Sequence, residues 1–276
     1  MVKLTSSREG YFTSEKEGVV QAMPEATYRA EPALSTSQLK LMKCPAEFKL
    51  DLDRQYAKRQ TPSMELGTMF HTYLLEPALF DKTHVVVPDE RSNMRLKANR
   101  EWKAEQEAQG VKLITEDDLK QLQRMVEAVK KEEAYDLLGH CETEVSVFSQ
   151  CAWPVASKCR VDAYHPGTET VIDIKTTSPG SASYRGFRNK SREFDYDLQQ
   201  YNYTHILATQ GVTVRRWLWL VVETGGFYQA ATYTYSKGCM LNAGTKAHNY
   251  MQTLTHCLAE DYWPGWTTGG AVELDF

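Results

Sequence analysis

The feature that most constrains the fold is a turn between two strand-like segments near the middle of the chain. Pro166 and Gly167 lie between runs rich in Val, Ile, Tyr and Thr, a pattern typical of a β-hairpin. If Gly167 and Thr168 form the loop, a symmetric register places Asp162 directly across from Asp173. Like charges opposed on one face of an antiparallel pair destabilise it, so the hairpin predicts a cation between the two carboxylates.

A lysine shares the face of the second aspartate. Residues two apart on a strand point to the same side, so Lys175 lies on the face of Asp173 while Ile174 points to the other face. Two carboxylates in polar surroundings suit a hard divalent cation, Mg²⁺ or Mn²⁺, which polarises a phosphoryl oxygen and acidifies bound water. Lys175 could then orient the attacking water or neutralise developing charge. The pattern predicts phosphodiester hydrolysis; a salt-bridged surface strand pair would show the same letters.

The order of the remaining elements predicts an α/β fold. Helices are expected from the capping box at Ser35, from Pro45, from Thr61-Pro62 and from Thr115 to about Leu138. Strands are expected at 143–149, 155–164 and 170–176, then a helix over about 195–210, two strands around Gly225-Gly226 and a helix near 240–260. The order predicts a central mixed β-sheet flanked by helices, in one domain over 31–276 that follows an irregular lead-in over 1–30.

One of these helices carries a candidate metal ligand. The segment opened by Thr61-Pro62 has apolar residues at i, i+3, i+4, i+7 and i+8, which predicts a buried helix. His71 flanks that stripe, and Gly67, one turn earlier, is expected to leave open space beside the imidazole. A core histidine bonded to a backbone carbonyl is the alternative; the aspartates of the hairpin favour a metal role.

Composition excludes several classes of protein. No apolar run approaches the about 20 residues that span a bilayer, and the polar N-terminus lacks a signal sequence, so we expect a cytoplasmic protein without membrane contact. Six cysteines without C-x-x-C spacing disfavour a zinc site. The net charge of −4 requires any DNA binding to come from local basic patches.

The clearest basic patch follows the hairpin. The segment YRGFRNKSR at 184–192 is expected to be a loop just after the lysine strand. Phosphate contacts are therefore predicted for Arg185, Arg188, Lys190 and Arg192. The alternative is an ordinary solvated loop.

A set of short motifs, taken together, resembles a known family. The set comprises His71 in GTMFH, Glu144 in TEVSV, Asp162 in CRVDAY, Asp173-Ile174-Lys175 in VIDIKTT, and Gln199 with Tyr203 in YDLQQYNY. In order and spacing it resembles the PD-(D/E)XK nucleases, whose core is restriction-endonuclease-like, and more narrowly the branch with the RecB nuclease domain and the RecE-type exodeoxyribonuclease VIII. The segment STSQLKLMKCPAEFKL is similar to the leading helix of that branch. The resemblance covers about residues 32 to 260.

The resemblance implies a role for each motif residue. Asp162 and Asp173 would be metal ligands, with the carbonyl of Ile174 completing the shell. His71 would be a further ligand or hold a metal-bound water, and Glu144 would add a carboxylate, for which Glu142 is the alternative. Lys175 would be the catalytic lysine, while Gln199 and Tyr203 would steady the site and approach the DNA backbone.

The resemblance also implies a function. It suggests a Mg²⁺-dependent exodeoxyribonuclease, with Mn²⁺ as a substitute, that digests linear double-stranded DNA from 5′ to 3′ and leaves 3′ single strands. Such enzymes form ring-shaped homo-oligomers, trimers or tetramers, and work beside a single-strand-annealing recombinase in phage or prophage recombination and DNA repair. The chain lacks the cysteines of the iron–sulfur members and any helicase motor motif, so a stand-alone nuclease is expected.

Two alternatives stay open. The first is a structure-specific endonuclease or nickase on the same core. The second is a non-catalytic DNA-binding protein that has kept the fold. The set of Asp162, Asp173 and Lys175 speaks against the second alternative, because a binding protein has no need of opposed carboxylates.

Overall fold

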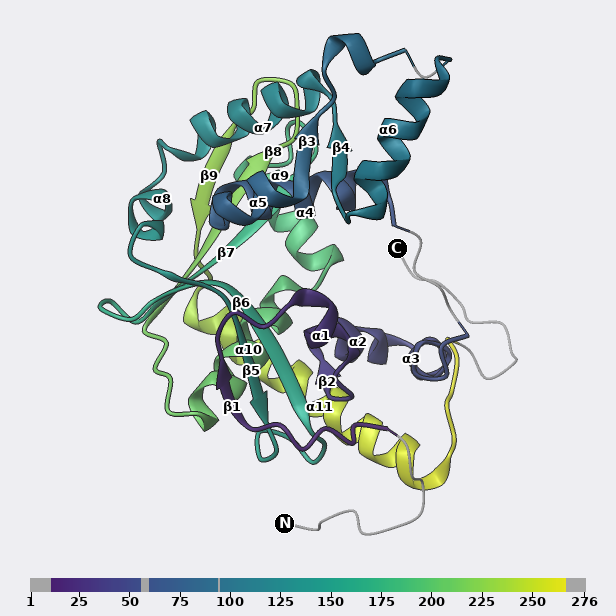
Figure 1. Cartoon of the computed structure of the whole chain (residues 1–276). Helices are drawn as coiled ribbons and strands as arrows, with labels where there is room; N and C mark the ends of the chain where they lie inside the picture. The colour runs from purple at the N-terminus through teal and green to yellow at the C-terminus, as the bar shows by residue number, and fades with distance from the viewer. Residues whose placement is uncertain (1–10, 56–59, 94, 267–276) are drawn as a thin grey trace.

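A twisted mixed β-sheet forms the centre of the molecule (Figure 1). The computed structural model describes residues 11–55, 60–93 and 95–266. Within them, one path through the sheet runs β1-β5-β6-β7-β8-β9, and β2 pairs in parallel with β6. The strands are β1 Gly18–Val20, β2 Leu34–Ser35, β5 Glu142–Ser149, β6 Ser157–His165, β7 Thr170–Thr177, β8 Arg216–Glu223 and β9 Ala230–Tyr233. Because β7 and β8 are parallel while β5–β6 and β6–β7 are antiparallel, the predicted mixed sheet is confirmed.

The hairpin has the predicted register. His165 pairs with Thr170, and Ala163 with Ile172, which closes a four-residue turn over 166–169. The pairs of β6 and β7 end at Ala163 and Ile172, and the same register continued by one step places Asp162 opposite Asp173. The turn has four residues instead of the two expected, but it keeps the register that was predicted from the sequence.

Helices cover both faces of the sheet (Figure 1). A first core cluster lies under α2 Thr36–Leu39, α3 Pro45–Leu52, α9 Tyr184–Glu193, α10 Tyr196–Thr209 and α11 Lys237–Glu260. A second core cluster lies under α4 Pro62–Leu75, α5 Pro77–Thr83, α7 Glu116–Val129 and α8 Glu133–Leu138. The chain passes from β7 through α9 and α10 to β8, and this crossover makes the parallel pair.

The predicted helix starts are confirmed where the sequence contains a recognisable capping residue. Ser35 and Thr115 each form a capping box, and Thr61 accepts a hydrogen bond from the Met64 N–H. The long helix expected up to Leu138 is instead two helices, α7 and α8. The break lets both ends contribute to the second core cluster, where Val129 and Ala134 are fully buried.

Two predictions about α4 need correction. Only Phe70 of its apolar stripe is fully buried; Leu66, Met69, Tyr73 and Leu74 are half-buried. Gly67 has no open space beside it, because a Cβ there would lie 3.0 Å from the Thr176 hydroxyl oxygen. The glycine instead allows α4 to approach β7 closely, and this approach carries His71 to the sheet.

Several short elements had no clear sequence signal. Strand β1 and helix α1 Glu25–Ala30 lie in the segment expected to be irregular, of which residues 1–10 are outside the described part. Strands β3 His84–Val86 and β4 Lys112–Ile114 form a separate parallel pair beside α6 Lys97–Ala108. The division into a lead-in over 1–30 and one domain over 31–276 stays a prediction. No helix of the described residues is long and apolar enough to cross a membrane.

The loop predicted over 184–192 is wrong, since this segment is helix α9. Ser183 caps it by accepting the Gly186 N–H, and Phe187 and Ser191, four residues apart, face the protein. The basic side chains then lie on its outer face, so the high charge of this segment reflects a solvated helix face.

Candidate metal-binding and catalytic site

Three acidic residues stand in one row across β5, β6 and β7. The pairs that flank Glu144 place it opposite Asp162, and the register of β6 and β7, continued one step beyond its last pair, places Asp162 opposite Asp173. The backbone ladder is interrupted at this row, and the backbone N–H of Ile174 donates to Asp162 Oδ2 at 2.8 Å. A side chain thus replaces a strand partner at the point where the acids converge.

The strand geometry changes at the same row. Val161 packs into the first core cluster and Ala163 into the second, although residues two apart in a regular strand share a face. Opposite Asp162, Glu144 has a left-handed backbone with φ of 53°. Such a conformation costs about 1–3 kcal/mol for a non-glycine residue, and strain of this kind is common at functional sites.

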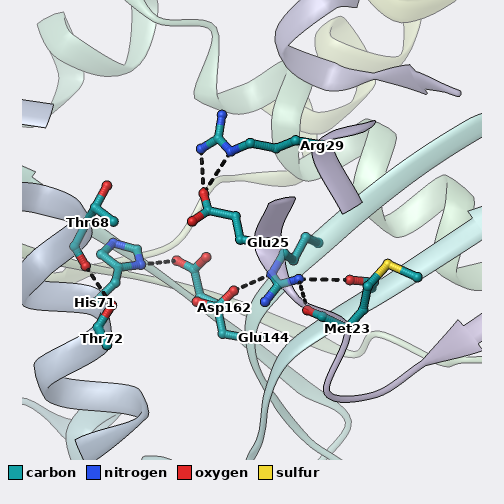
Figure 2. Close-up of polar contacts among 10 residues, drawn as sticks. Met23, Glu25, Arg29, Thr68, His71, Thr72, Glu144 and Asp162 are labelled. Atoms are coloured by element: carbon teal, nitrogen blue, oxygen red, sulfur yellow. Dashed lines mark hydrogen bonds and ion pairs between the residues drawn. The ribbon is translucent and has the colours of Figure 1, made fainter. Parts of the chain in front are cut away.

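Helix α4 brings His71 to this row. Its Nε2 lies 3.1 Å from the carbonyl oxygen of Ile174, and its Nδ1 lies 3.7 Å from Asp162 Oδ2. Figure 2 shows the contact of His71 with Asp162, beside Glu144. A neutral imidazole that donates from Nε2 to the carbonyl leaves the lone pair of Nδ1 facing the carboxylate. The imidazole is therefore oriented as a ligand would be.

His71, Glu144 and Asp162 form a candidate metal centre. One ligand atom from each lies within 4.8 Å of the other two. One imidazole nitrogen and two carboxylates fit a divalent cation such as Mn²⁺ or Mg²⁺. Glu144 is held by Arg160, whose Nε pairs with Glu144 Oε2 and whose Nη1 donates to the Met23 carbonyl at 2.7 Å.

Asp173 takes part in a neighbouring network. Asp173 is buried, with 1% of the residue exposed, and its carboxylate pairs with Lys175 Nζ and accepts a hydrogen bond of 2.6 Å from Gln199 Nε2. Lys175 Nζ also lies 5.2 Å from the ring centroid of Tyr196 and 5.3 Å from that of Trp219. The lysine is thus fixed between a carboxylate and two aromatic rings, beside the metal centre.

Burial shifts the ionisation of these groups. It raises the pKa of Glu144 to about 7, with the charge of Asp162 adding to the effect and Arg160 opposing it. It also raises the pKa of Asp173 to about 6, against the opposing charge of Lys175. Burial lowers the pKa of Lys175, but Asp173 and Asp162 outweigh it and the net shift is upward. Two carboxyl groups that titrate near neutrality lie where a cation would displace their protons.

A cavity of about 1350 Å³ leads to this site. Its walls come from the segment that includes α1 and α2 on one side and from α4 on the other, and His71, Glu144 and Asp162 line it. Tyr203 also lines the cavity and packs edge-to-face on Trp217, with ring centroids 6.0 Å apart. Gln199 and Tyr203 lie one turn apart on α10. Gln199 contacts Asp173, and Tyr203 lines the cavity that leads to the metal centre.

Other predicted residues lie outside this centre. Glu142 is exposed and accepts a hydrogen bond from Gln21, so the structure favours Glu144 over it. On α9, Lys190 pairs with Glu193. Three exposed arginines on that helix have no salt-bridge partner in the described part of the chain: Arg185, Arg188 and Arg192.

Sequence reasoning missed two basic residues of the site. Arg160 stands two residues before Asp162, and this spacing was a usable signal. Lys40 follows α2 and reaches Gln199 Oε1 at 3.4 Å, a contact between residues 159 apart in sequence that no local pattern indicates.

Comparisons with known proteins agree with this fold. No curated protein shows significant similarity to the chain. A crystal structure of a protein described as a "putative exonuclease" from Eubacterium rectale is similar in fold, with a TM-score of 0.62 and 12% identity, over 93% of this chain and 97% of that one. The family described as "PDDEXK-like domain of unknown function (DUF3799)" matches residues 35–273. The chain belongs to this family of PDDEXK-like domains.

Proposed function

We propose that this protein is a divalent-metal-dependent exodeoxyribonuclease. The observation that carries the proposal is the convergence of Glu144, Asp162 and Asp173 from three neighbouring strands, with His71 against Asp162 and the fixed Lys175 against Asp173. Membership of a PDDEXK-like family supports a nuclease. The likeness in fold to a protein described as a "putative exonuclease" favours action from DNA ends.

The metal would be held by three side chains, those of His71, Glu144 and Asp162, with Asp173 on the neighbouring strand. The Ile174 carbonyl, which the sequence resemblance implies as a further ligand, instead lies 3.1 Å from His71 Nε2 and would orient the imidazole. When bound, a divalent cation acts as a Lewis acid toward a phosphoryl oxygen and acidifies water.

The protein's own residues would stabilise negative charge on the substrate and hold the charged side chains in place. Lys175 is a preorganised cation, because Asp173, Tyr196 and Trp219 hold its ammonium group in one place. An ammonium in that position would stabilise negative charge that develops on the phosphoryl oxygens without having to reorganise. Gln199 fixes Asp173 from the other side through its 2.6 Å hydrogen bond.

The finer function follows from the sequence resemblance. We propose Mg²⁺ as the ion, digestion of linear duplex from 5′ to 3′, and 3′ single strands passed to a single-strand-annealing recombinase in phage-type recombination. A ring-shaped homo-oligomer, a trimer or tetramer, would confine DNA despite the net charge of −4. The exposed arginines on α9, Arg185, Arg188 and Arg192, with Lys190 beside them, would contact phosphates.

The test is digestion of a linear duplex labelled at one 5′ or one 3′ end, beside a closed circular duplex, with Mg²⁺ and with EDTA. We expect early release of the 5′ label from linear DNA in Mg²⁺ but not in EDTA, and no cutting of the circle in either condition. Early release of the 3′ label would reverse the proposed direction. Cutting of the circle would identify an endonuclease or nickase, and no cutting at all would leave a DNA-binding protein.

A further inference from the structure

A second lysine approaches the catalytic network from a distant part of the chain. Lys40 begins the short 3₁₀ helix Lys40–Lys43, next to α2. Its Nζ lies 5.3 Å from the ring centroid of Tyr196, the same ring over which Lys175 Nζ lies at 5.2 Å. Two ammonium groups thus converge on one aromatic ring beside Asp173.

The two lysines differ in their partners. Lys175 pairs with Asp173, whereas the polar contact of Lys40 is the neutral Gln199 Oε1 at 3.4 Å, and no carboxylate of the described residues lies within salt-bridge distance of it. The carboxylates on the adjacent start of α10 have other partners, since Lys246 binds Asp195 and Asp197, and Lys43 also binds Asp195. A half-buried ammonium without an anion is costly, and the cost is removed when a ligand supplies one.

The surroundings of Lys40 make its charge responsive to such a ligand. Burial lowers its pKa to about 7, and the Lys175 ammonium from β7 acts in the same direction. Asp173 from β7 and Asp195 and Asp197 from α10 oppose that shift. The other groups that face it, Tyr196 and Gln199, are uncharged at neutral pH. Burial and Lys175 outweigh the aspartates, so the pKa of Lys40 falls to near neutrality, and an added anion beside Lys40 would stabilise the ammonium form.

We propose that Lys40 binds a phosphate of the DNA strand next to the one that Lys175 faces, and takes up a proton as the strand binds. This inference rests on the proposed nuclease function and adds to it a phosphate-binding position outside the row of acids. A phosphate oxygen supplies the anion that Lys40 lacks in the protein alone.

The test measures DNA binding without hydrolysis. A short fluorescein-labelled DNA duplex is titrated in EDTA with wild-type protein, Lys40→Met, Lys40→Arg and Lys120→Met, at about pH 6 and about pH 8.5, on either side of the Lys40 pKa of about 7. Lys120 is an exposed lysine on α7, so its replacement changes net charge equally, away from the site. Thermal unfolding of each variant confirms that it is folded.

We expect Lys40→Met to weaken binding about tenfold at pH 6, the loss typical of one charge-assisted contact, while Lys120→Met binds like the wild type. Lys40→Arg, which stays charged, should retain affinity at pH 8.5 better than the wild type. Calorimetry in two buffers of different ionisation enthalpy should show less proton uptake for Lys40→Arg than for the wild type.

The outcomes separate this inference from the proposed function. Equal affinity of Lys40→Met and Lys120→Met, or equal proton uptake by Lys40→Arg and the wild type, would overturn the role of Lys40 while DNA cleavage by the wild type stands. A wild type that neither binds nor cleaves DNA would overturn both.

Discussion

Replacing Glu144 with Gln should stabilise the metal-free protein at alkaline pH. The carboxyl group of Glu144 has a pKa raised from 4.5 to about 7, mainly by burial. A group with a raised folded pKa favours the folded state below its unfolded pKa, and that stability is lost as pH rises through the folded value. Wild-type stability should therefore fall between about pH 4.5 and pH 7, whereas a neutral Gln removes this part of the fall.

The size of the effect follows from the shift. A change from 4.5 to about 7 corresponds to a contribution of at most about 3.5 kcal/mol, because one pKa unit is worth about 1.4 kcal/mol. In EDTA, Glu144→Gln should then unfold at higher urea than the wild type at pH 8 and at the same urea at pH 4.5.

The assay is urea unfolding in EDTA from pH 4.5 to pH 8. Glu142→Gln is the matched control, since Glu142 is exposed on the same strand. We expect this control to follow the wild type at every pH. A Glu144→Gln protein that is less stable than the wild type at pH 8, or that shows the same pH dependence, would refute the reasoning about buried charge.

Three further predictions concern the same site and its surroundings. Asp162→Asn keeps an oxygen that can accept a hydrogen bond from the Ile174 N–H, so the fold should persist. Its Mn²⁺ affinity, measured by calorimetry, should fall by at least about 10–100-fold, the loss typical when a residue that supports a metal ligand is replaced. Unchanged affinity would exclude Asp162 as a ligand. Lys175→Ala should lower the cleavage rate about a hundredfold or more, with Mn²⁺ affinity retained, and normal turnover would remove it from the mechanism. Arg188→Glu should weaken DNA binding and reduce the slope of log affinity against log salt by about one, whereas an unchanged slope would exclude α9 from the DNA path.

The sequence predicted the structure well where short-range signals, such as a turn or a helix cap, determine the position of an element. The Pro166-Gly167 turn set the register of β6 and β7, and with it the meeting of Asp162 and Asp173. Capping residues located the starts of α2, α4 and α7 because their hydrogen bonds lie within one turn. His71 lies beside Asp162, and its role as a metal ligand, expected from its helix and from the family resemblance, stays a prediction.

The sequence was less informative where tertiary contacts determine the secondary structure or the position of a side chain. Strands β3 and β4 each have three residues and gain their hydrogen bonds from a partner far along the chain. The charge of 184–192 suggested a loop, but burial of Phe187 and Ser191 stabilises a helix. The spacing of Arg160 and Asp162 was a usable signal, but Lys40 enters the site through a contact with Gln199 that no spacing in the sequence encodes.

The most direct test of the central claim asks whether metal-dependent cleavage requires Glu144. The rate of linear duplex cleavage is measured as Mg²⁺ is titrated into wild-type protein, Glu144→Gln and Glu142→Gln. We expect saturable, EDTA-sensitive cleavage for the wild type and the Glu142 variant, and little or none for Glu144→Gln at the same Mg²⁺ concentrations. Metal-independent cleavage, or equal curves for the two variants, would contradict a metal-dependent nuclease centred on His71, Glu144 and Asp162.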